Sequence, residues 1–401
     1  MKIKIKLSII VIAIMAIIVT GIAAVLLFRA SNIAESLSVR SIGYLCDHQA
    51  EYWKGREDGH VRMLRTLADI MADYEDMEPD VRRNRFDSML LGTITSNPGI
   101  TSLYTVWKPN AVDGMDAENI GRPGSTATGQ YAINYTRETG PLTIRTTSDV
   151  DASMAHINGP NARKDRVEDP IMRNIAGKEM YVFRIVVPII NSKTKEVVGG
   201  VGCLMTIDQI QPTVEQIIRD HTEIAVMAVY TNSGFILAHL VPERVGKYLI
   251  DVDTLYGDKI NDVNRAISDG RAYETASYSP VLKSNVMIDI SPFSIGNSDT
   301  TWSVMTAATE EYILTEVREM TLFAVIMGAI AIVAAAAIIF FVINPCSGVS
   351  NSIVGQHLRQ SVQIAFVRML VEILIGKRLR IVYTQLFQET GKYVLRCFCP
   401  E

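Results

Sequence analysis

Two long apolar stretches, one near each end, constrain this chain most. Residues 7–28 and 321–343 contain no charged side chain. As helices, both are long enough to cross a hydrocarbon core of about 30 Å. The first could instead be a signal peptide, but its apolar run exceeds the roughly 7–15 residues typical of one, and no small-residue cleavage site clearly follows it. The alternative for the second, a buried core helix, is disfavoured by its uncharged length. We therefore expect two membrane-spanning helices.

Charge predicts the orientation of these helices. Three lysines precede the first stretch, and the tail 344–401 holds more basic than acidic residues, although the whole chain has a net charge of −4. Basic flanks stay in the cytoplasm. We therefore expect residues 1–6 and 344–401 to be cytoplasmic and the acidic region 29–320 to lie outside, on the other side of the membrane. An acidic region of this kind argues against binding to nucleic acid.

A helical pattern opens the region between the two stretches. Apolar residues recur at steps of three or four from Val39 to Tyr74, without a proline. We expect a long helix within residues 29–85. Its apolar stripe suits packing against a domain core, and it equally suits packing against the same helix of a second copy, which would make the protein a homodimer.

Short strands follow, and their pattern occurs twice. The strings "MYVFRIVVPII" and "VVGGVGCLMTI" predict a hairpin of β-branched strands around a polar turn. Later, "NVMIDISPFSIGNSDTTWSVMTAATEEYI" repeats the order of strand, proline, polar turn, strand and helix. We therefore expect an α+β fold with two similar modules in tandem, a membrane-distal one at 86–218 and a membrane-proximal one at 219–320.

No motif of a catalytic, metal or cofactor site is present. The six histidines form no HExxH motif or other cluster at ligand spacing, and no GxSxG, P-loop or dinucleotide-binding glycine motif occurs. We expect a protein that is not an enzyme and binds no metal or cofactor, with a membrane-anchored hydrolase as a remote alternative. Cys46 and Cys203 could form a disulfide in an oxidising compartment, but two buried free thiols suit their helix and strand patterns better.

The order of these segments resembles the double Cache sensor region of bacterial methyl-accepting chemotaxis receptors. The resemblance covers residues 1–343 and includes the strings "GGVGCLMTIDQIQ", "VYTNSGFILAH" and "VGKYL". It implies a transmembrane receptor of the bacterial inner membrane, with a periplasmic sensor region whose distal module binds a small ligand. It also implies that the signal passes through the second stretch to a HAMP unit and a long coiled coil, the part that engages a chemotaxis kinase and adaptor.

The resemblance also implies which residues line the distal pocket. Matching by position places Tyr104 and Trp107 on the pocket wall, together with Tyr131, Tyr135 and Arg137 of "GQYAINYTRETG". Aromatic rings give apolar enclosure, and an arginine fork suits a carboxylate. The alternative is that the two later tyrosines are ordinary strand aromatics and that Arg137 is a surface charge.

The element "EDPIMRNIAGKE" departs from the amino-acid-binding members of the family. Its Asp169 and Pro170 match them, but Arg173 stands where an aspartate takes the ammonium group of the ligand. Arginine cannot accept a hydrogen bond from ammonium. Two arginines suit an anionic organic acid, such as a dicarboxylate, better than an ordinary amino acid, and we expect such an acid, or an amino-acid-like molecule, to bind near Arg137, Asp169 and Arg173. The loop "HINGPNARKDRVEDP" should lie over the same mouth, although its Lys164 and Arg166 could simply be solvated.

The tail 344–401 departs from the family further. Its residues lack sustained heptads and are too few for the family's methylated helical hairpin. We expect a receptor whose output part is missing through truncation or a frameshift. The alternatives are the sensor region of a histidine kinase or cyclase and, less favoured, a structural surface protein.

Overall fold

The computed structural model describes residues 3–148 and 150–343. The chain groups into two compact units: residues 27–322 form one, and the segments before and after them form the other. The expected cytoplasmic tail 344–401 and the first two residues lie outside the described residues.

Helices occupy both ends of the larger unit. The chain begins with α1 (Ile3–Ala72), and α7 (Glu310–Ile343) is its last described element. A short turn, η1 (Tyr74–Asp76), separates α1 from α2 (Pro79–Ser96). The helical segment expected over 29–85 is therefore two helices. Pro79 stands at the first turn of α2, where its missing N–H leaves no helical hydrogen bond unmade.

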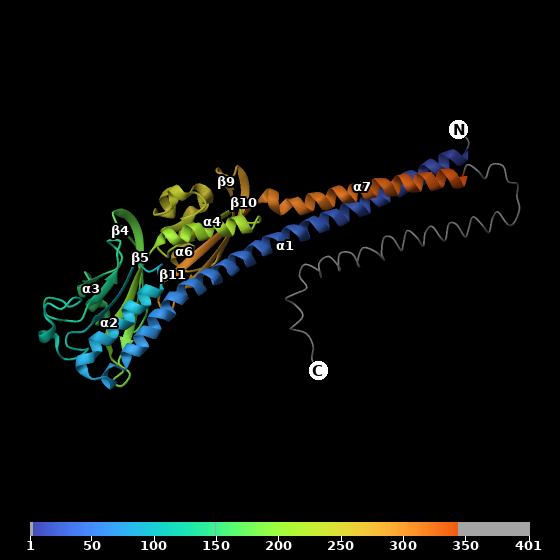
Figure 1. Cartoon of the computed structure of the whole chain (residues 1–401). Helices are drawn as coiled ribbons and strands as arrows, with labels where there is room; N and C mark the ends of the chain where they lie inside the picture. Colours follow the sequence, from blue (N-terminus) through green and yellow to red (C-terminus); the bar gives the residue numbers. More distant parts are fainter. Residues whose placement is uncertain (1–2, 149, 344–401) are drawn as a thin grey trace, which may run out of the picture. The chain divides into compact units, whose positions relative to one another are not determined.

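The distal module contains a six-stranded antiparallel sheet in the order β3-β2-β1-β6-β5-β4 (Figure 1). Its central strand β6 is buried at every position, because both faces of the sheet are covered. Short helices η2 (Asp116–Asn119) and α3 (Val150–Ile157) lie in its connections. The strands are β1 (Ser102–Trp107), β2 (Ile133–Thr136), β3 (Thr143–Thr146), β4 (Arg166–Ile175), β5 (Lys178–Ile190) and β6 (Val197–Thr206).

The proximal module repeats this arrangement with a five-stranded antiparallel sheet in the order β8-β7-β11-β10-β9. Its strands are β7 (Val226–Tyr230), β8 (Ile236–His239), β9 (Tyr273–Ser279), β10 (Ser284–Ser294) and β11 (Thr301–Thr309). Its helices are η3 (Ile207–Gln209), α4 (Ile210–Asp220), η4 (Pro242–Arg244), α5 (Leu249–Val252), η5 (Thr254–Lys259) and α6 (Ile260–Ser268).

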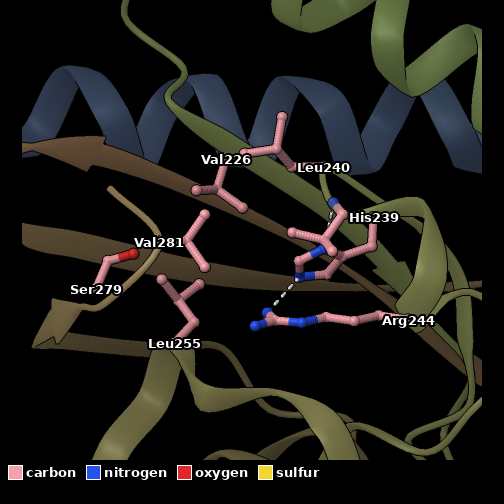
Figure 2. Close-up of a pocket in the computed structure, with 8 residues that line it drawn as sticks. Val226, His239, Leu240, Arg244, Leu255, Ser279 and Val281 are labelled. Carbon is pink, nitrogen blue, oxygen red and sulfur yellow. Dashed lines mark hydrogen bonds between the residues drawn. The ribbon is translucent and has the colours of Figure 1, made fainter. Parts of the chain in front are cut away.

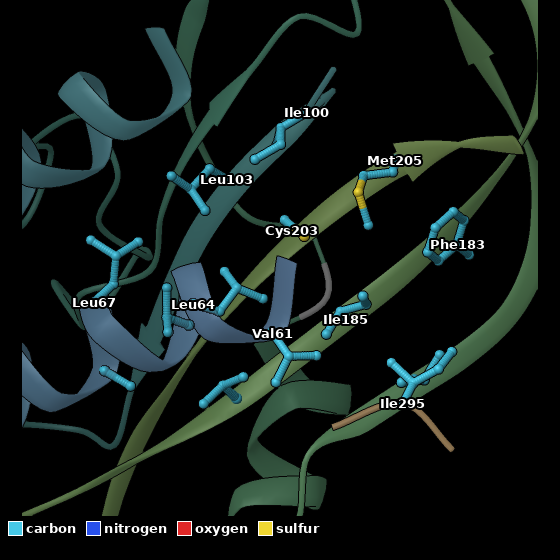
Figure 3. Packing of buried hydrophobic residues seen from close by; sticks show 14 of the residues in the cluster. Val61, Leu64, Leu67, Ile100, Leu103, Phe183, Ile185, Cys203, Met205 and Ile295 are labelled. Atoms are coloured by element: carbon cyan, nitrogen blue, oxygen red, sulfur yellow. The ribbon is translucent and has the colours of Figure 1, made fainter. Parts of the chain in front are cut away.

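One face of α1 packs against both sheets. Val61 and Leu64 lie over Ile185 and Cys203 of the distal sheet, and Ile295, just beyond β10, joins the same cluster (Figure 3). Buried residues follow α1 at steps of three or four, as a helix with one buried face requires. The long helix is thus a shared support for the two modules.

The sequence-based expectation of an α+β fold with two antiparallel sheets is confirmed by this architecture. The described residues of the smaller unit are helical and belong to the first part of α1 and the last part of α7. Within the described part of the chain, no helix meets the length and hydropathy that a membrane crossing needs. Cys46 and Cys203 are free and buried, as expected.

A buried carboxyl group lies where α1 crosses the proximal sheet. Asp289 of β10 faces Gly43 of α1, and its Oδ2 atom is buried without a hydrogen bond to a described residue. Glu274 and Thr306 are its cross-strand neighbours, and Asp47 of α1 is nearby. Burial, together with the charges of Glu274 and Asp47, raises the pKa of Asp289 from its ordinary 3.8 to about 6.

This raised pKa predicts a pH-dependent stability. The folded protein binds the Asp289 proton more tightly than the unfolded chain does, so the stabilisation is complete below about pH 4 and is lost as the pH rises through about 6. Asp289→Asn should remove that loss and raise the free energy of unfolding at pH 7.5 by about 1–3 kcal/mol. Urea unfolding at pH 4.5 and pH 7.5 checks this, with the exposed Asp299→Asn as control. An unchanged pH dependence in Asp289→Asn would contradict it.

Candidate ligand-binding site

The strand β1 presents its residues to two different environments. Leu103 and Trp107 belong to the core cluster that includes α1 and α2, whereas Tyr104 and Val106 pack on the other face with residues of α3. This division follows from the alternation of side chains along a strand. The face that carries Tyr104 is the one hollowed beneath α3.

Glycines of β6 form the floor of this hollow. Tyr104 lies directly opposite Gly202 in the β1–β6 pairing, and a Cβ atom on Gly202 would lie 2.6 Å from the Tyr104 Oη atom. Gly200, two residues earlier on the same face, also lines the hollow. The absence of a side chain at Gly202 lets the end of the tyrosine ring approach the β6 backbone closely, and glycine within a strand often serves such a close approach.

Two arginines hold one glutamate above this floor. Arg184 of β5 and Glu168 of β4 are cross-strand partners, with Arg184 Nη1 3.3 Å from Glu168 Oε2. Arg166 lies two residues before Glu168, on the same face, with its Nη2 atom 3.0 Å from Glu168 Oε1. The guanidinium carbon of Arg184 is 5.7 Å from the Tyr104 ring centre. Among the described residues, Glu168 is thus the shared partner of two arginines.

A histidine completes the polar lining. His156 of α3 lines the hollow, and its Nε2 atom is buried without a hydrogen bond to a described residue. Burial and the positive charge of Arg166 lower the pKa of His156, which a backbone hydrogen bond at Lys164 and the charge of Glu168 only partly offset. The imidazole is therefore neutral at pH 7, and its Nε2 atom can donate to or accept from a bound molecule.

The hollow is nearly closed in this structure. Its free volume is ≈ 10 Å³, about the space that one water molecule needs. A molecule of several heavy atoms therefore enters only if α3, or the segment that begins β4, moves. We call this place the distal hollow and define it by Tyr104, His156, Arg166, Glu168, Arg184 and Gly200.

Of the residues that the sequence suggested for the pocket, Tyr104 lines the distal hollow. Trp107, Tyr131 and Tyr135 lie on the other face of the sheet, in the core. Trp107 stacks on Phe86 with ring centres 5.5 Å apart. The Tyr131 hydroxyl donates to Asp87 Oδ1 at 2.6 Å, and burial raises its pKa. All three side chains therefore lie in the core, on the opposite face of the sheet from Tyr104.

The three charged residues suggested for the pocket lie elsewhere as well. Arg137 donates to the carbonyl oxygens of Ile94 and Ile100 at 2.8 and 2.7 Å, at the end of α2. Asp169 is exposed at a bulge in β4. Arg173, beyond the bulge, pairs with Glu138 at 3.7 Å. The structure therefore does not bring these three side chains together around the distal hollow.

The capping role of Arg137 gives a prediction opposite to the expected ligand contact. Arg137→Ala removes two hydrogen bonds from a charged group to carbonyls at the end of α2. It should lower the free energy of unfolding by about 1–3 kcal/mol and leave the stabilisation by a ligand intact. Urea unfolding and thermal shifts with organic acids measure the two effects. Loss of the ligand effect with unchanged stability would restore Arg137 to the site.

The sequence analysis did not single out Glu168, Arg184 or His156, although the loop that it expected over the mouth contains Glu168 and His156, and it left open whether Arg166 is solvated. A signal for Arg184 exists, because it is a lone charge inside the apolar run "VFRIVVP". A charge in the middle of a buried strand needs a partner. Arg166 and Glu168 stand two apart, which places both on one face of a strand. His156 carries no comparable signal in the sequence.

A second hollow in the proximal module has a different character. Its free volume is also ≈ 10 Å³, and His239 and Arg244 line it (Figure 2). Both are committed to the buried Asp253, with Arg244 Nη1 2.6 Å and His239 Nε2 3.3 Å from its oxygens. Although burial acts to raise it, the His239 and Leu255 hydrogen bonds and the Arg244 charge hold the pKa of Asp253 below its ordinary value. We therefore interpret this hollow as a packed internal network.

No metal centre is evident among residues 3–148 and 150–343, where no three histidine, cysteine, aspartate or glutamate side chains come together as a metal site requires.

Known proteins give a consistent picture of the fold. No family model matches the chain, and neither does any curated protein sequence. Among solved structures, the extracellular domain of the histidine kinase mmHK1S-Z2 aligns with a TM-score of 0.57 at 21% identity, covering 70% of this chain and 99% of that domain. The periplasmic sensory domain of the Campylobacter jejuni chemoreceptor Tlp1 aligns with a TM-score of 0.52 at 16% identity, covering 69% and 96%.

A third structure, described as methyl-accepting chemotaxis protein X, aligns with a TM-score of 0.53 at 16% identity, covering 69% of this chain and 99% of that one. The chain therefore has the fold of the sensor domains of chemoreceptors and histidine kinases. This is the fold that the double Cache resemblance implied.

Proposed function

We propose that this chain is a membrane-anchored receptor that senses a small anionic organic molecule in the distal hollow. The observation that carries the proposal is the Arg166–Glu168–Arg184 cluster above Tyr104. Arginine forks bind carboxylates through two parallel hydrogen bonds. In the closed hollow the Glu168 carboxylate occupies the position between the two forks.

The ligand class follows from charge and size. Two arginine forks face the hollow, and the neutral His156 adds one more polar contact. A ligand carboxylate that replaces Glu168 between the arginines restores their pairing in a site with little water, where the interaction is strong. Tyr104 gives the ligand an aromatic surface. Short mono- and dicarboxylates therefore fit the site best.

Thermal shift measurements test this proposal. The full-length protein is melted with acetate, lactate, succinate or malate, and with neutral amino acids as the comparison set. The proposal predicts a higher melting temperature with at least one organic acid, because a ligand that binds only the folded state stabilises it. Stabilisation by neutral amino acids alone, or by none of these molecules, would contradict the ligand class.

We also propose that the apolar stretches 7–28 and 321–343 anchor the receptor in the bacterial inner membrane. Their uncharged sequence and basic flanks support this, although no described helix meets the requirement for a crossing. Ile17, Val25 and Phe323 are more than half exposed, as side chains that face lipid would be. Such an exposed apolar surface is otherwise unfavourable in water. Release of the protein from membranes by alkaline carbonate would contradict the anchors.

The outer face of α1 supports a homodimer. Ile33, Leu37 and Tyr44 are more than half exposed and lie at helical spacing opposite the buried face of α1. An exposed apolar row of this kind suits a second copy of the helix. Leu37→Cys should therefore form a disulfide-linked dimer under mild oxidation, whereas Asn32→Cys, an exposed position about 140° away around the helix, should do so far less. Equal cross-linking at both positions would contradict this dimer.

A further inference from the structure

The loop that leads into the distal hollow is attached to the proximal module. This α3–β4 loop (residues 158–165) ends at Asp165, next to Arg166 of the hollow. The Asp165 side chain is 1% exposed, and its Oδ2 atom accepts a hydrogen bond from Asn297 N at 2.7 Å. Asp165 N in turn donates to Asn297 O at 3.3 Å. Asn297 belongs to the β10–β11 turn (residues 295–300) of the proximal module.

Other contacts strengthen this attachment. Arg65 of α1 forms an ion pair with Asp165. Thr300, at the end of the turn, donates through its Oγ1 atom to Val167 O at 3.2 Å. Asp165 and Val167, the two neighbours of Arg166 in the chain, are thus both hydrogen-bonded to the turn. Arg166 and Glu168 face the hollow.

Gly296 shows how tightly the turn is held. Its backbone has a φ of +56°, and a Cβ atom would lie 2.6 Å from Asp165 Oδ2 and 2.9 Å from Val61 of α1. Its N–H donates to Asp58 Oδ1 of α1 at 2.8 Å. The turn therefore has little freedom to move independently of Asp165 and α1.

The turn is also the start of the path toward the second apolar stretch. β11 begins at Thr301, directly after the turn, and α7 begins at Glu310, directly after β11. A displacement of the turn along β11 therefore acts on the first turn of α7 without any intervening loop.

We infer that Asp165 and Thr300 couple the distal hollow to the β10–β11 turn, so that a ligand displacing Glu168 shifts β11 and the start of α7. This inference rests on the proposed function. The hollow has room for about one water molecule, so entry of a carboxylate requires α3 or the Arg166–Glu168 segment to move, and displacement of Glu168 moves the second of these. The contacts of Asp165 and Thr300 transmit that movement to the turn. The ligand can shift the two states only by the difference in its affinity for them.

Hydrogen–deuterium exchange on the full-length protein tests the coupling without a ligand. Glu168→Gln removes the carboxylate from between the arginines. We expect it to change exchange in residues 295–300 and 310–315 by about threefold or more, and to leave the β7–β8 turn (231–234) unchanged, since its hydrogen bonds stay within the proximal module. In an Asp165→Asn background the response should disappear. Asp258→Asn, an exposed carboxylate of η5 that pairs with Lys259 within the proximal module, should preserve it.

Each other outcome overturns the coupling. A response that persists with Asp165→Asn shows that the contact does not carry it, and no response in 295–300 shows that the hollow and the turn move independently. If Asp165→Asn does not fold, the Glu168→Gln map alone decides the matter: a change confined to 295–300 and 310–315 supports the coupling, and a change that also reaches 231–234, or none, overturns it.

Organic acids separate this inference from the proposed function. If acetate, lactate, succinate and malate all fail to stabilise the protein while the variants behave as expected, the ligand class fails and the coupling stands. If one of these acids stabilises the protein, and does so only when Arg184 is present, while exchange in residues 295–300 stays the same, the coupling fails and the ligand class stands.

Discussion

Arg83→Met should lower the free energy of unfolding by about 3–5 kcal/mol, because it leaves two buried carboxylates without their shared cation. Arg83 of α2 is 1% exposed. Its guanidinium donates to Asp113 at 2.6 and 2.9 Å, to Asp116 at 2.6 Å and to Gly129 O at 2.8 Å. Methionine keeps much of the apolar length but none of these bonds. Urea unfolding of the full-length protein measures the loss.

Arg85→Met is the matched control for this prediction. It makes the same replacement two residues along the same helix, at an exposed position, and should change stability by no more than about 0.5 kcal/mol. If Arg83→Met behaved like Arg85→Met, the long β1–β2 loop would be held by something other than this arginine. The loop "KPNAVDGMD" is turn-rich because it must bring both aspartates to one guanidinium.

Arg184→Gln should weaken the binding of the organic acid that stabilises the protein by at least about 30-fold, since truncating one member of a buried charge pair costs about 2–5 kcal/mol. Arg184 is 8% exposed and contacts both Glu168 and the Tyr104 ring. Glutamine retains a hydrogen-bond donor but neither the charge nor the fork. The melting temperature as a function of acid concentration gives the affinity.

Arg173→Gln controls for a general effect of charge. It removes an arginine from β4, the same strand that carries Arg166, at a position that pairs with Glu138 outside the distal hollow. It should leave the affinity for the organic acid unchanged. If both variants weakened binding of the acid equally, the affinity would depend on the net charge of the module, and the acid would have no defined site.

Much of the fold could be predicted from the sequence because it depends on local patterns. The apolar hairpin strings gave β5 with β6 and β10 with β11, and the repeated order of strands gave two sheets of related topology. The expected boundary at residue 85, in contrast, falls inside α2, because Pro79 was not used as a helix start. The start of α2 could have been predicted from Pro79 alone, because proline is favoured in the first turn of a helix.

The site could be predicted only in part, for reasons of geometry. Tyr104 and Trp107 are three residues apart, so alternation alone places them on opposite faces of a strand. The bulge after Glu168 turns Asp169 to solvent, and a bulge leaves no clear signal in one sequence. The pairing of Tyr131 with Asp87 and the capping by Arg137 depend on contacts between distant segments, which strand patterns do not contain.

The most direct test of binding in the distal hollow is to map which backbone amides an organic acid protects from exchange. Hydrogen–deuterium exchange of the full-length protein is compared with and without the acid that raises its melting temperature. We expect the acid to slow exchange in residues 150–168 and 182–186, which surround the distal hollow. Exchange around His239 and Arg244 should stay the same. Protection centred on the proximal hollow, or on Tyr131 and Arg137, would contradict it.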